Sequence, residues 1–237
     1  MQGKIVIKLG GSLLFSKSYE INVKKITEFC NIIIEKKDFD KLVIICGGGL
    51  IARKYIDAVR EFQENEALCD TYGIDISRLN SRLMIAALKD LAYPQVPCSL
   101  EDLSVALLLK KVAVLGGIQP GQSTTSVALQ VGEFIKADEI LILTDVDGIY
   151  DKDPNKFSDA KLIKRANYED LKRLFIDSDT KNQSAAGEYR IFDAVSLQIL
   201  KRSDLKLRIL SGKDLSSFKN YWSGNEAIKG TIVSNEG

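Results

Sequence analysis

The chain has 237 residues, of which 45% are hydrophobic, and its 33 basic residues nearly balance its 32 acidic ones. A chain of this size buries a substantial core, either as one large α/β domain or as two lobes. The balanced charge, without a polybasic run or tail, argues against nucleic acid or an anionic membrane as a partner. The sequence contains no histidine, which excludes histidine acid–base catalysis and Cys/His zinc sites.

The four cysteines, Cys30, Cys46, Cys69 and Cys98, stand far apart and form no CxxC pair, so we expect reduced cysteines in the core. The first residues lead directly into a predicted strand, without the apolar region of a signal peptide. No apolar run reaches the length that spans a membrane. These features predict a cytoplasmic protein.

Short β-branched runs, glycine turns and amphipathic helices alternate from the start of the chain. A strand over 4–9 ends in Gly10, Gly11 and Ser12, and the spacing then predicts a helix over 23–36. Its expected buried face consists of Ile26, Phe29, Cys30, Ile33 and Ile34. The second unit is a strand over 41–46, the turn Gly47, Gly48 and Gly49, and a helix over 50–62 with Arg53 in its first turn.

The third and fourth units follow a long helical segment. A helix with an apolar stripe is predicted from Ser77 to residue 88, and Asp70 lies ahead of it, either to reach a ligand or to cap the helix. A strand over 111–115 then enters the glycine-rich loop 116–122, and Ser123, Thr124 and Thr125 are candidate caps for the next helix. A strand over 139–143 leads into the Asp-Gly turn 144–150.

The remaining segment has weaker signals. It predicts strands over 161–163, 205–210 and 231–233, the last of them at the sheet edge, and helices over 167–175 and 191–202. The polar segment 177–187 is predicted to be a loop. No repeat or linker is visible, so we expect a single domain over 1–237; two lobes would meet near 121–127.

Apolar strands that alternate with helices predict a mostly parallel sheet with helices on both faces. Right-handed crossovers place the turns that follow the strands at one edge, where α/β proteins bind ligands. A glycine turn that opens a helix presents backbone N–H groups to an anion such as phosphate. We therefore expect the four turns to converge on a phosphate site.

The sequence has no Walker A motif, no GxGxxG fingerprint and no protein-kinase HRD or DFG set. Lys8, Arg53 and Asp147 nevertheless supply two cations and a carboxylate at the predicted edge. This inventory suits phosphoryl transfer, which depends on positioning and charge neutralisation rather than on a histidine. A lysine at the end of an apolar strand also needs an anionic partner.

Five motifs in order resemble the amino-acid kinase superfamily, and within it the archaeal-type UMP kinases. They are Lys8 to Ser12, Gly47 to Gly49 with Ala52 to Tyr55, Asp70 with Gly73 and Arg78 to Asn80, Gly116 to Gln122, and Thr144 to Tyr150 with Asp153 and Pro154. The resemblance covers nearly the whole chain up to Arg202. It implies a three-layer α/β/α fold and the reaction of ATP with UMP to give ADP and UDP.

The resemblance also implies partners and residue roles. Magnesium would accompany ATP, held mainly by the nucleotide phosphates and by no protein metal site, and the protein would form a homohexamer. Roughly, residues 1–122 would bind UMP and residues 123–237 would bind ATP. Lys8 would stabilise the transferring phosphoryl group, with Arg53 beside it, and Asp147 would orient Lys8 or hydrated magnesium. The expected ATP-binding residues are Gly11, Ser12, Gly49, Arg53, Thr144, Tyr150 and Asp153, and the expected UMP-binding residues are Gly48, Asp70, Ile118, Gln119, Pro120, Gly121, Gln122, Ser123 and Thr124.

Three departures from the family pattern accompany the motifs. Asp145 stands where Asn is common, Ile118 where Thr is common, and Asp193 is followed by Ala194 in place of proline. Two alternatives to a UMP kinase stay open. One is a related kinase acting on an acylamino acid, aspartate, carbamate or isopentenyl phosphate; the other is a non-catalytic protein of this fold that binds nucleotides or oxyanions.

Overall fold

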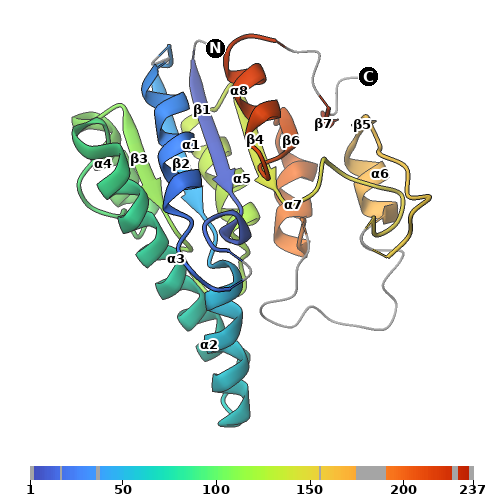
Figure 1. Ribbon diagram of the computed structural model, residues 1–237, viewed down its shortest axis with the longest axis horizontal. Helices are drawn as coiled ribbons and strands as arrows, with labels where there is room; N and C mark the ends of the chain where they lie inside the picture. Colours follow the sequence, from blue (N-terminus) through green and yellow to red (C-terminus); the bar gives the residue numbers. More distant parts are fainter. Residues whose placement is uncertain are drawn as a thin grey trace.

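The computed structural model describes residues 3–16, 18–35, 38–154, 156–174, 191–225 and 229–234. In these ranges seven strands form one sheet in the order β3-β2-β1-β4-β6-β7-β5, with helices on both faces (Figure 1). Neighbouring strands are parallel, apart from the antiparallel pair β6 and β7. The three-layer, mostly parallel architecture expected from the sequence is confirmed.

The strands are apolar because both faces of the sheet are covered. In β1, Ile5, Ile7 and Leu9 point into one core and Val6 points into the other, which is the period of two expected of a strand. The strands are β1 (Lys4–Leu9), β2 (Lys41–Cys46), β3 (Val112–Leu115), β4 (Glu139–Thr144), β5 (Arg165–Ala166), β6 (Leu207–Ser211) and β7 (Thr231–Val233).

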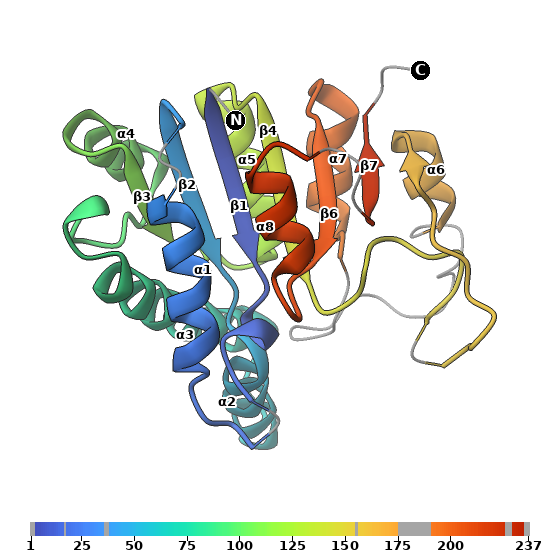
Figure 2. The same ribbon diagram turned by 45° about the horizontal axis from the view of Figure 1, so that its top comes forward.

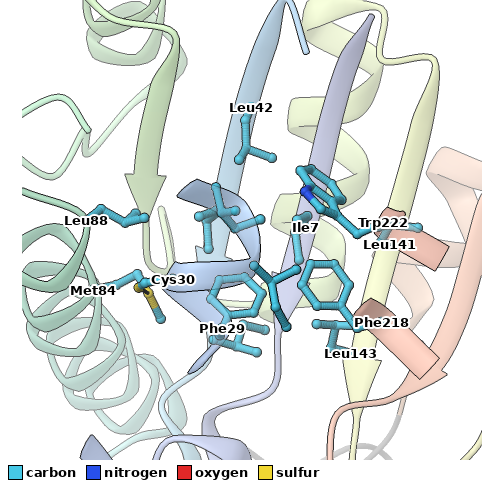
Figure 3. Close-up of a cluster of buried hydrophobic side chains, with 14 of the residues drawn as sticks. Ile7, Phe29, Cys30, Leu42, Met84, Leu88, Leu141, Leu143, Phe218 and Trp222 are labelled. Carbon is cyan, nitrogen blue, oxygen red and sulfur yellow. Dashed lines mark hydrogen bonds between the residues drawn. The ribbon is translucent and has the colours of Figure 1, made fainter. Parts of the chain in front are cut away.

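One face of the sheet is covered by α1 (Val23–Glu35), α3 (Glu66–Leu88) and α8 (Ser216–Trp222). Aromatic side chains from α1 and α8 meet over the middle of the sheet, where the rings of Phe29 and Phe218 stack at 5.2 Å (Figure 3). Met84 of α3 is fully buried in the same core. This face therefore joins the first helix of the chain to the last.

The opposite face is covered by α4 (Leu100–Leu109), α5 (Thr124–Ile135), α6 (Tyr168–Lys172) and α7 (Ala194–Arg202). The remaining helix, α2 (Gly49–Glu61), packs on α3 through a small core of Ile56, Val59 and Cys69. Two short 3-10 helices follow β1 and α3, at Gly11–Leu13 and Lys89–Leu91. Among the described helices, none has both the length and the apolar character needed to cross a bilayer.

The carboxyl ends of β1, β2, β3 and β4 lie at the same edge of the sheet, and α2 and the first turns of α3 project from this edge (Figures 1 and 2). The turns that follow neighbouring strands are also linked directly. The Gly10 N–H donates to the Leu143 carbonyl at 2.9 Å, and the Gly47 N–H donates to the Leu9 carbonyl at 2.9 Å. The hydrogen bonds between neighbouring strands therefore continue into the glycine turns, which fixes the turns relative to one another.

Several local predictions were wrong. Helix α3 begins at Glu66, where the Asn65 side chain caps it, so Asp70 lies inside the helix and not ahead of it. The strand predicted over 161–163 is absent; Leu162 forms only an isolated bridge with Tyr150, and β5 comes later. Strand β7 lies between β6 and β5 and not at the sheet edge. The two strand errors concern pairing that distant residues decide, whereas the start of α3 is marked by a local signal, the Asn65 cap.

Other differences concern burial and boundaries. Ile34 is exposed whereas Ile32 is buried, and Cys98 is exposed whereas the other three cysteines are buried. Helix α7 begins three residues later than predicted because Asp193 caps it. Helices α4 and α8 were not predicted. In α4 the buried face of Leu103, Ala106 and Leu107 does not stand out in the sequence, because the exposed Leu108 and Leu109 are apolar as well, and α8 is short. The predicted loop 177–187 lies outside the described residues.

A buried ion pair joins β4, β6 and α8. Arg208 and Glu139 approach to 3.4 Å, with 5% and 10% of their side chains exposed. The Tyr221 hydroxyl donates to Glu139, and its ring lies 4.3 Å from the Arg208 guanidinium. Because a buried charge without its counter-charge is strongly unfavourable, this network ties α8 to the sheet.

Substitution Glu139→Gln should therefore lower the free energy of unfolding by about 3 kcal/mol or more, measured by urea denaturation. The double variant Glu139→Gln/Arg208→Met, which removes both charges, should recover part of that loss. Asp159→Asn breaks the exposed Lys152–Asp159 pair and serves as the control, with a cost below about 1 kcal/mol. Equal costs for the buried and the exposed pair would contradict this account.

Candidate active site

A cleft of about 200 Å³ lies at the carboxyl edge of the sheet. Its walls come from the turns after β1, β2 and β3, from α2 and α3, and from the first residues of α5. The lining residues are Lys8, Gly10, Gly11, Ser12, Gly47, Gly48, Gly49, Ala52, Arg53, Ile56, Asp70, Gly73, Ile74, Ser77, Gly117, Gln122, Ser123, Thr124 and Thr125. Three of the four turns expected to converge thus line one cleft, and the turn after β4 begins beside it, where Leu143 accepts from Gly10.

The first two glycine turns touch backbone to backbone. A Cβ atom on Gly11 would lie 2.2 Å from the Gly49 nitrogen and 2.5 Å from the Gly47 carbonyl oxygen. Gly49 itself has φ +68°, a conformation that favours glycine. The glycines are therefore required by this close approach as well as by the turn.

Helix α2 begins in the cleft at Gly49, and its N-cap residue, Gly48, has no side chain to cap it. The first N–H groups of a helix have no partner within the helix and carry partial positive charge. Arg53 lies one turn along the same helix and also lines the cleft. Backbone amides and a guanidinium on one wall suit a phosphate group.

Helix α3 holds the turns at fixed positions through polar side chains on its buried face. The Asn80 amide donates to the Gly47 carbonyl at 2.8 Å, and the Gly117 N–H donates to the Ser77 hydroxyl at 2.7 Å. Sequence analysis assigned no role to these two residues. The signal was available, because Ser77, Asn80 and Ser81 interrupt the apolar stripe of a helix that is otherwise packed on the core.

Among the described residues that line the cleft, one has a carboxylate side chain, and this residue is Asp70. One of its oxygens accepts a hydrogen bond from the Gly121 N–H at 2.8 Å. This bond ties α3 to the loop after β3, which carries many of the residues predicted to bind UMP. A carboxylate has further acceptor positions, so Asp70 can hold the loop and still accept from a ligand hydroxyl.

A second carboxylate, Asp193, fixes the far end of that loop. It accepts from the Ser123 N–H at 2.8 Å, from the Ser126 hydroxyl at 2.5 Å and from the Ser196 N–H at 2.6 Å. Burial raises the pKa of Asp193, but the hydrogen bonds from Ser126, Ser196 and Ser123 together hold it below its ordinary value. Asp193 thereby joins the beginnings of α5 and α7, a role that its sequence position did not reveal.

Lys8 is half-buried at the carboxyl end of β1 and lines the cleft. The alternation of β1 places it on the face that α5 covers. Burial lowers the pKa of the Lys8 ammonium group to about 8, and the negative charge of Asp145 opposes part of that shift. An anionic ligand in the cleft would raise the pKa in the same way, so the site favours phosphate beside Lys8.

Asp147 lies in a different charge cluster. Its carboxylate is 2.5 Å from the Lys229 ammonium group and accepts from the Tyr150 hydroxyl at 3.1 Å. The hydrogen bond with Lys229 is the main cause that lowers the pKa of Asp147. The carboxylate whose charge acts on Lys8 is Asp145, so orientation of Lys8 or of magnesium by Asp147 stays a prediction.

The predicted site residues fall into two groups. Those that line the cleft are Lys8, Gly11, Ser12, Gly48, Gly49, Arg53, Asp70, Gln122, Ser123 and Thr124. The others are not lining residues: Ile118, Gln119, Pro120 and Gly121 belong to the loop held by Asp70, Thr144 ends β4, and Asp147, Tyr150 and Asp153 follow it. Thr144, Tyr150 and Asp153, predicted to hold the ATP nucleoside, are not lining residues of this cleft, although Thr144 lies next to Gly10, which is one.

Glycine turns, helix N-termini and a half-buried lysine at one edge of an α/β/α sheet suit a protein that binds and transfers phosphoryl groups. The chain belongs to the amino acid kinase family, whose family model matches residues 3–211. The family expected from the five motifs is confirmed.

Relatives within this family carry a more specific name. A protein named Uridylate kinase from Methanocaldococcus jannaschii is 40% identical over 231 residues, covering 97% of this chain and 99% of that protein. A second, from Methanobrevibacter smithii, is 39% identical over 223 residues, covering 94% and 96%. A crystal structure of uridylate kinase from Archaeoglobus fulgidus aligns with a TM-score of 0.78 at 31% identity, covering 97% of this chain and 99% of that chain.

Because a Cβ atom on Gly11 would collide with the backbone of the second glycine turn, Gly11→Ala should force the two turns apart. We expect its affinity for ATP, measured by titration calorimetry, to fall at least ~10-fold, or about 1.4 kcal/mol. Gly121→Ala is the control, since no atom lies within 4 Å of a Cβ there and only the φ of +77° is unfavourable. Unchanged ATP affinity in Gly11→Ala would show that the turns do not hold the nucleotide.

Proposed function

We propose that this chain is a UMP kinase, which transfers the γ-phosphoryl group of ATP to UMP and yields ADP and UDP. The relatives named Uridylate kinase, at 34–40% identity over nearly the whole chain, support this activity. The observation that carries the mechanism is the single cleft in which Lys8, Arg53 and two glycine turns lie together. Such a cleft can hold two phosphate groups end to end beside a cation.

In this proposal the donor phosphates lie on the turn after β1, near Gly11 and Ser12, and on the first turn of α2. Lys8 neutralises the charge that spreads over the transferring phosphoryl group, and Arg53, which lines the same cleft, supports it. The ATP nucleoside extends past the end of β4 toward Thr144, Tyr150 and Asp153. Residues 123–237 would then form the ATP lobe and residues 1–122 the acceptor lobe.

The acceptor nucleotide lies between α3 and the loop after β3. Asp70 accepts from the ribose hydroxyls with the oxygen that does not hold Gly121, and Gly48 contacts the UMP phosphate. The loop from Ile118 to Thr124 surrounds the base and sugar. A ribose-bearing acceptor explains a carboxylate in the cleft better than a non-nucleotide acceptor does.

Magnesium enters this proposal as part of the ATP complex. Across the described ranges, no three aspartate, glutamate or cysteine side chains gather as ligands of one ion would. Asp70 holds Gly121, and Asp147 is paired with Lys229. Magnesium keeps several waters and binds phosphate oxygens readily, so the nucleotide can supply its ligands.

The protein is also proposed to be a homo-oligomer, with a hexamer as the expectation from the family resemblance. An apolar groove on α3 is consistent with an interface between copies. It is lined by Phe15, Ile21, Ile51, Ile76, Leu79, Asn80, Arg82 and Leu83. Leu79 is 60% exposed, and Asp75 and Arg82 flank it on the same helix face, so two antiparallel α3 helices would bring opposite charges together.

The cytoplasmic location stays a prediction.

An ADP-release assay with UMP, CMP, dUMP and the non-nucleotide acceptors should give the highest kcat/KM with UMP. Lys8→Ala should lower that turnover by ~100-fold or more, because the transferring group loses its cation. Circular dichroism and thermal unfolding should show an intact fold. Turnover only with a non-nucleotide acceptor would identify a different kinase of the family, and nucleotide binding without any turnover would identify a non-catalytic protein.

The depressed pKa of Lys8 also predicts a pH dependence. Since its pKa is about 8, the free enzyme loses the Lys8 proton above that pH, and kcat/KM should fall toward tenfold per pH unit. Bound phosphates raise the pKa, so the fall in kcat should begin at a higher pH. Arginine stays protonated, so the activity that remains in Lys8→Arg should lack this alkaline limb. An identical limb in both proteins would contradict the assignment.

A further inference from the structure

Arg78, a side chain of α3, binds two backbone carbonyl groups of the loop that follows β3. Arg78 donates from Nε to the Gly117 carbonyl and from Nη2 to the Ile118 carbonyl, each at 3.1 Å. Its side chain is half-buried beneath the loop, while the loop lies about 40 residues further along the chain. One edge of a rigid guanidinium thus fixes two successive peptide groups.

The two hydrogen bonds determine which way the loop backbone faces. In a trans peptide the N–H points opposite to the carbonyl of the preceding residue, and the described chain has no cis peptide bonds. With both carbonyls turned toward Arg78, the N–H groups of Ile118 and Gln119 point away from α3. Rotation of either peptide would reverse one of these donors and leave a carbonyl without its partner.

Two other side chains of α3 hold the ends of the same loop, at Gly117 and at Gly121. The Gly117 N–H donates to Ser77, and the Gly121 N–H donates to Asp70. Ile74 packs so closely under Gly117 that a Cβ atom there would lie 2.8 Å from its side chain. Arg78 is therefore the contact on α3 that orients the peptides between two anchored ends. A lysine, with a single ammonium group, does not reproduce the planar pair of donors.

We propose that Arg78 is a positioning residue that sets the shape of the acceptor loop and thereby the affinity for the nucleoside monophosphate. This inference rests on the proposed function. Arg78 is not a lining residue of the cleft, so its effect passes through the loop. The donor phosphates lie on the other turns, so the effect falls on the acceptor and not on ATP.

The test compares Arg78→Met and Arg78→Lys with matched changes at Arg60. Arg60 uses the same two donor groups, Nε and Nη2, on the Glu66 carboxylate at 2.8 and 2.7 Å, and it too connects to α3. In Arg78→Met the KM for UMP should rise at least ~10-fold, while the KM for ATP stays within about twofold. Arg78→Lys should lie between this variant and the wild type. Arg60→Met and Arg60→Lys should leave both KM values unchanged.

Amide hydrogen exchange, followed by mass spectrometry, gives a second readout that needs no substrate. Exchange in the segment 116–122 should quicken in Arg78→Met and not in Arg60→Met. The proposal is overturned if exchange and the KM for UMP match those of the Arg60 variants, or if the KM values for UMP and ATP rise together with a loss of thermal stability. If the wild type turns over no UMP, the proposed function fails, and unchanged exchange in Arg78→Met would separately overturn the orienting role of Arg78.

Discussion

The architecture of the site depends on one close backbone contact, where the turn after β1 crosses the turn after β2. Gly11 lies against Gly47 and Gly49 at distances that leave no room for a side chain. This contact brings Lys8, at the end of β1, and Arg53, in the first turn of α2, to a shared cleft. Two cations from separate β-strand and helix units thus line one cleft because the backbones between them touch.

Helix α3 extends this arrangement to the third turn. Asn80 holds the second turn by the Gly47 carbonyl, and Ser77, Arg78 and Asp70 hold the loop after β3. A rigid helix of 23 residues thus sets the separation between the first two glycine turns and the loop after β3. In the proposed reaction this separation matters more than acid–base chemistry, since phosphoryl transfer depends on alignment and on neutralising charge.

Among the charged groups around the cleft, Lys8 has a positive charge that a nearby carboxylate neutralises only in part. Asp145 acts on it, but burial still lowers its pKa to about 8. Asp147, by contrast, is neutralised by Lys229, and Asp193 is satisfied by hydrogen bonds from the beginnings of two helices. An anion that enters the cleft therefore gains most beside Lys8, where the unfavourable energy of a half-buried ammonium group is relieved.

The sequence by itself determined the layered fold, the glycine turns at one strand edge and the family. These follow from apolar runs, periodicity and glycine spacing, which are local properties of the chain. It also placed Lys8 and Arg53 at the cleft, because residues next to strand ends share the edge on which the strands end. The expectation that Asp70 contacts a ligand came from the family resemblance, since Asp70 lies within α3 and not at a strand end. It did not predict α4, α8 or the position of β5, since these depend on packing against distant segments. The first turns of α3 were also missed, although the Asn65 cap that begins this helix is a local signal.

Only the tertiary structure decided which charges meet. Asp145 and Asp147 stand two residues apart, yet one acts on Lys8 and the other pairs with Lys229. Asp193 reaches Ser123 across 70 residues, and Arg78 reaches the Ile118 carbonyl across 40. Local periodicity reports which face of an element is buried; it carries no information on which distant element covers that face. The crossovers between strands decide that, and with it the partners of every polar group at the site.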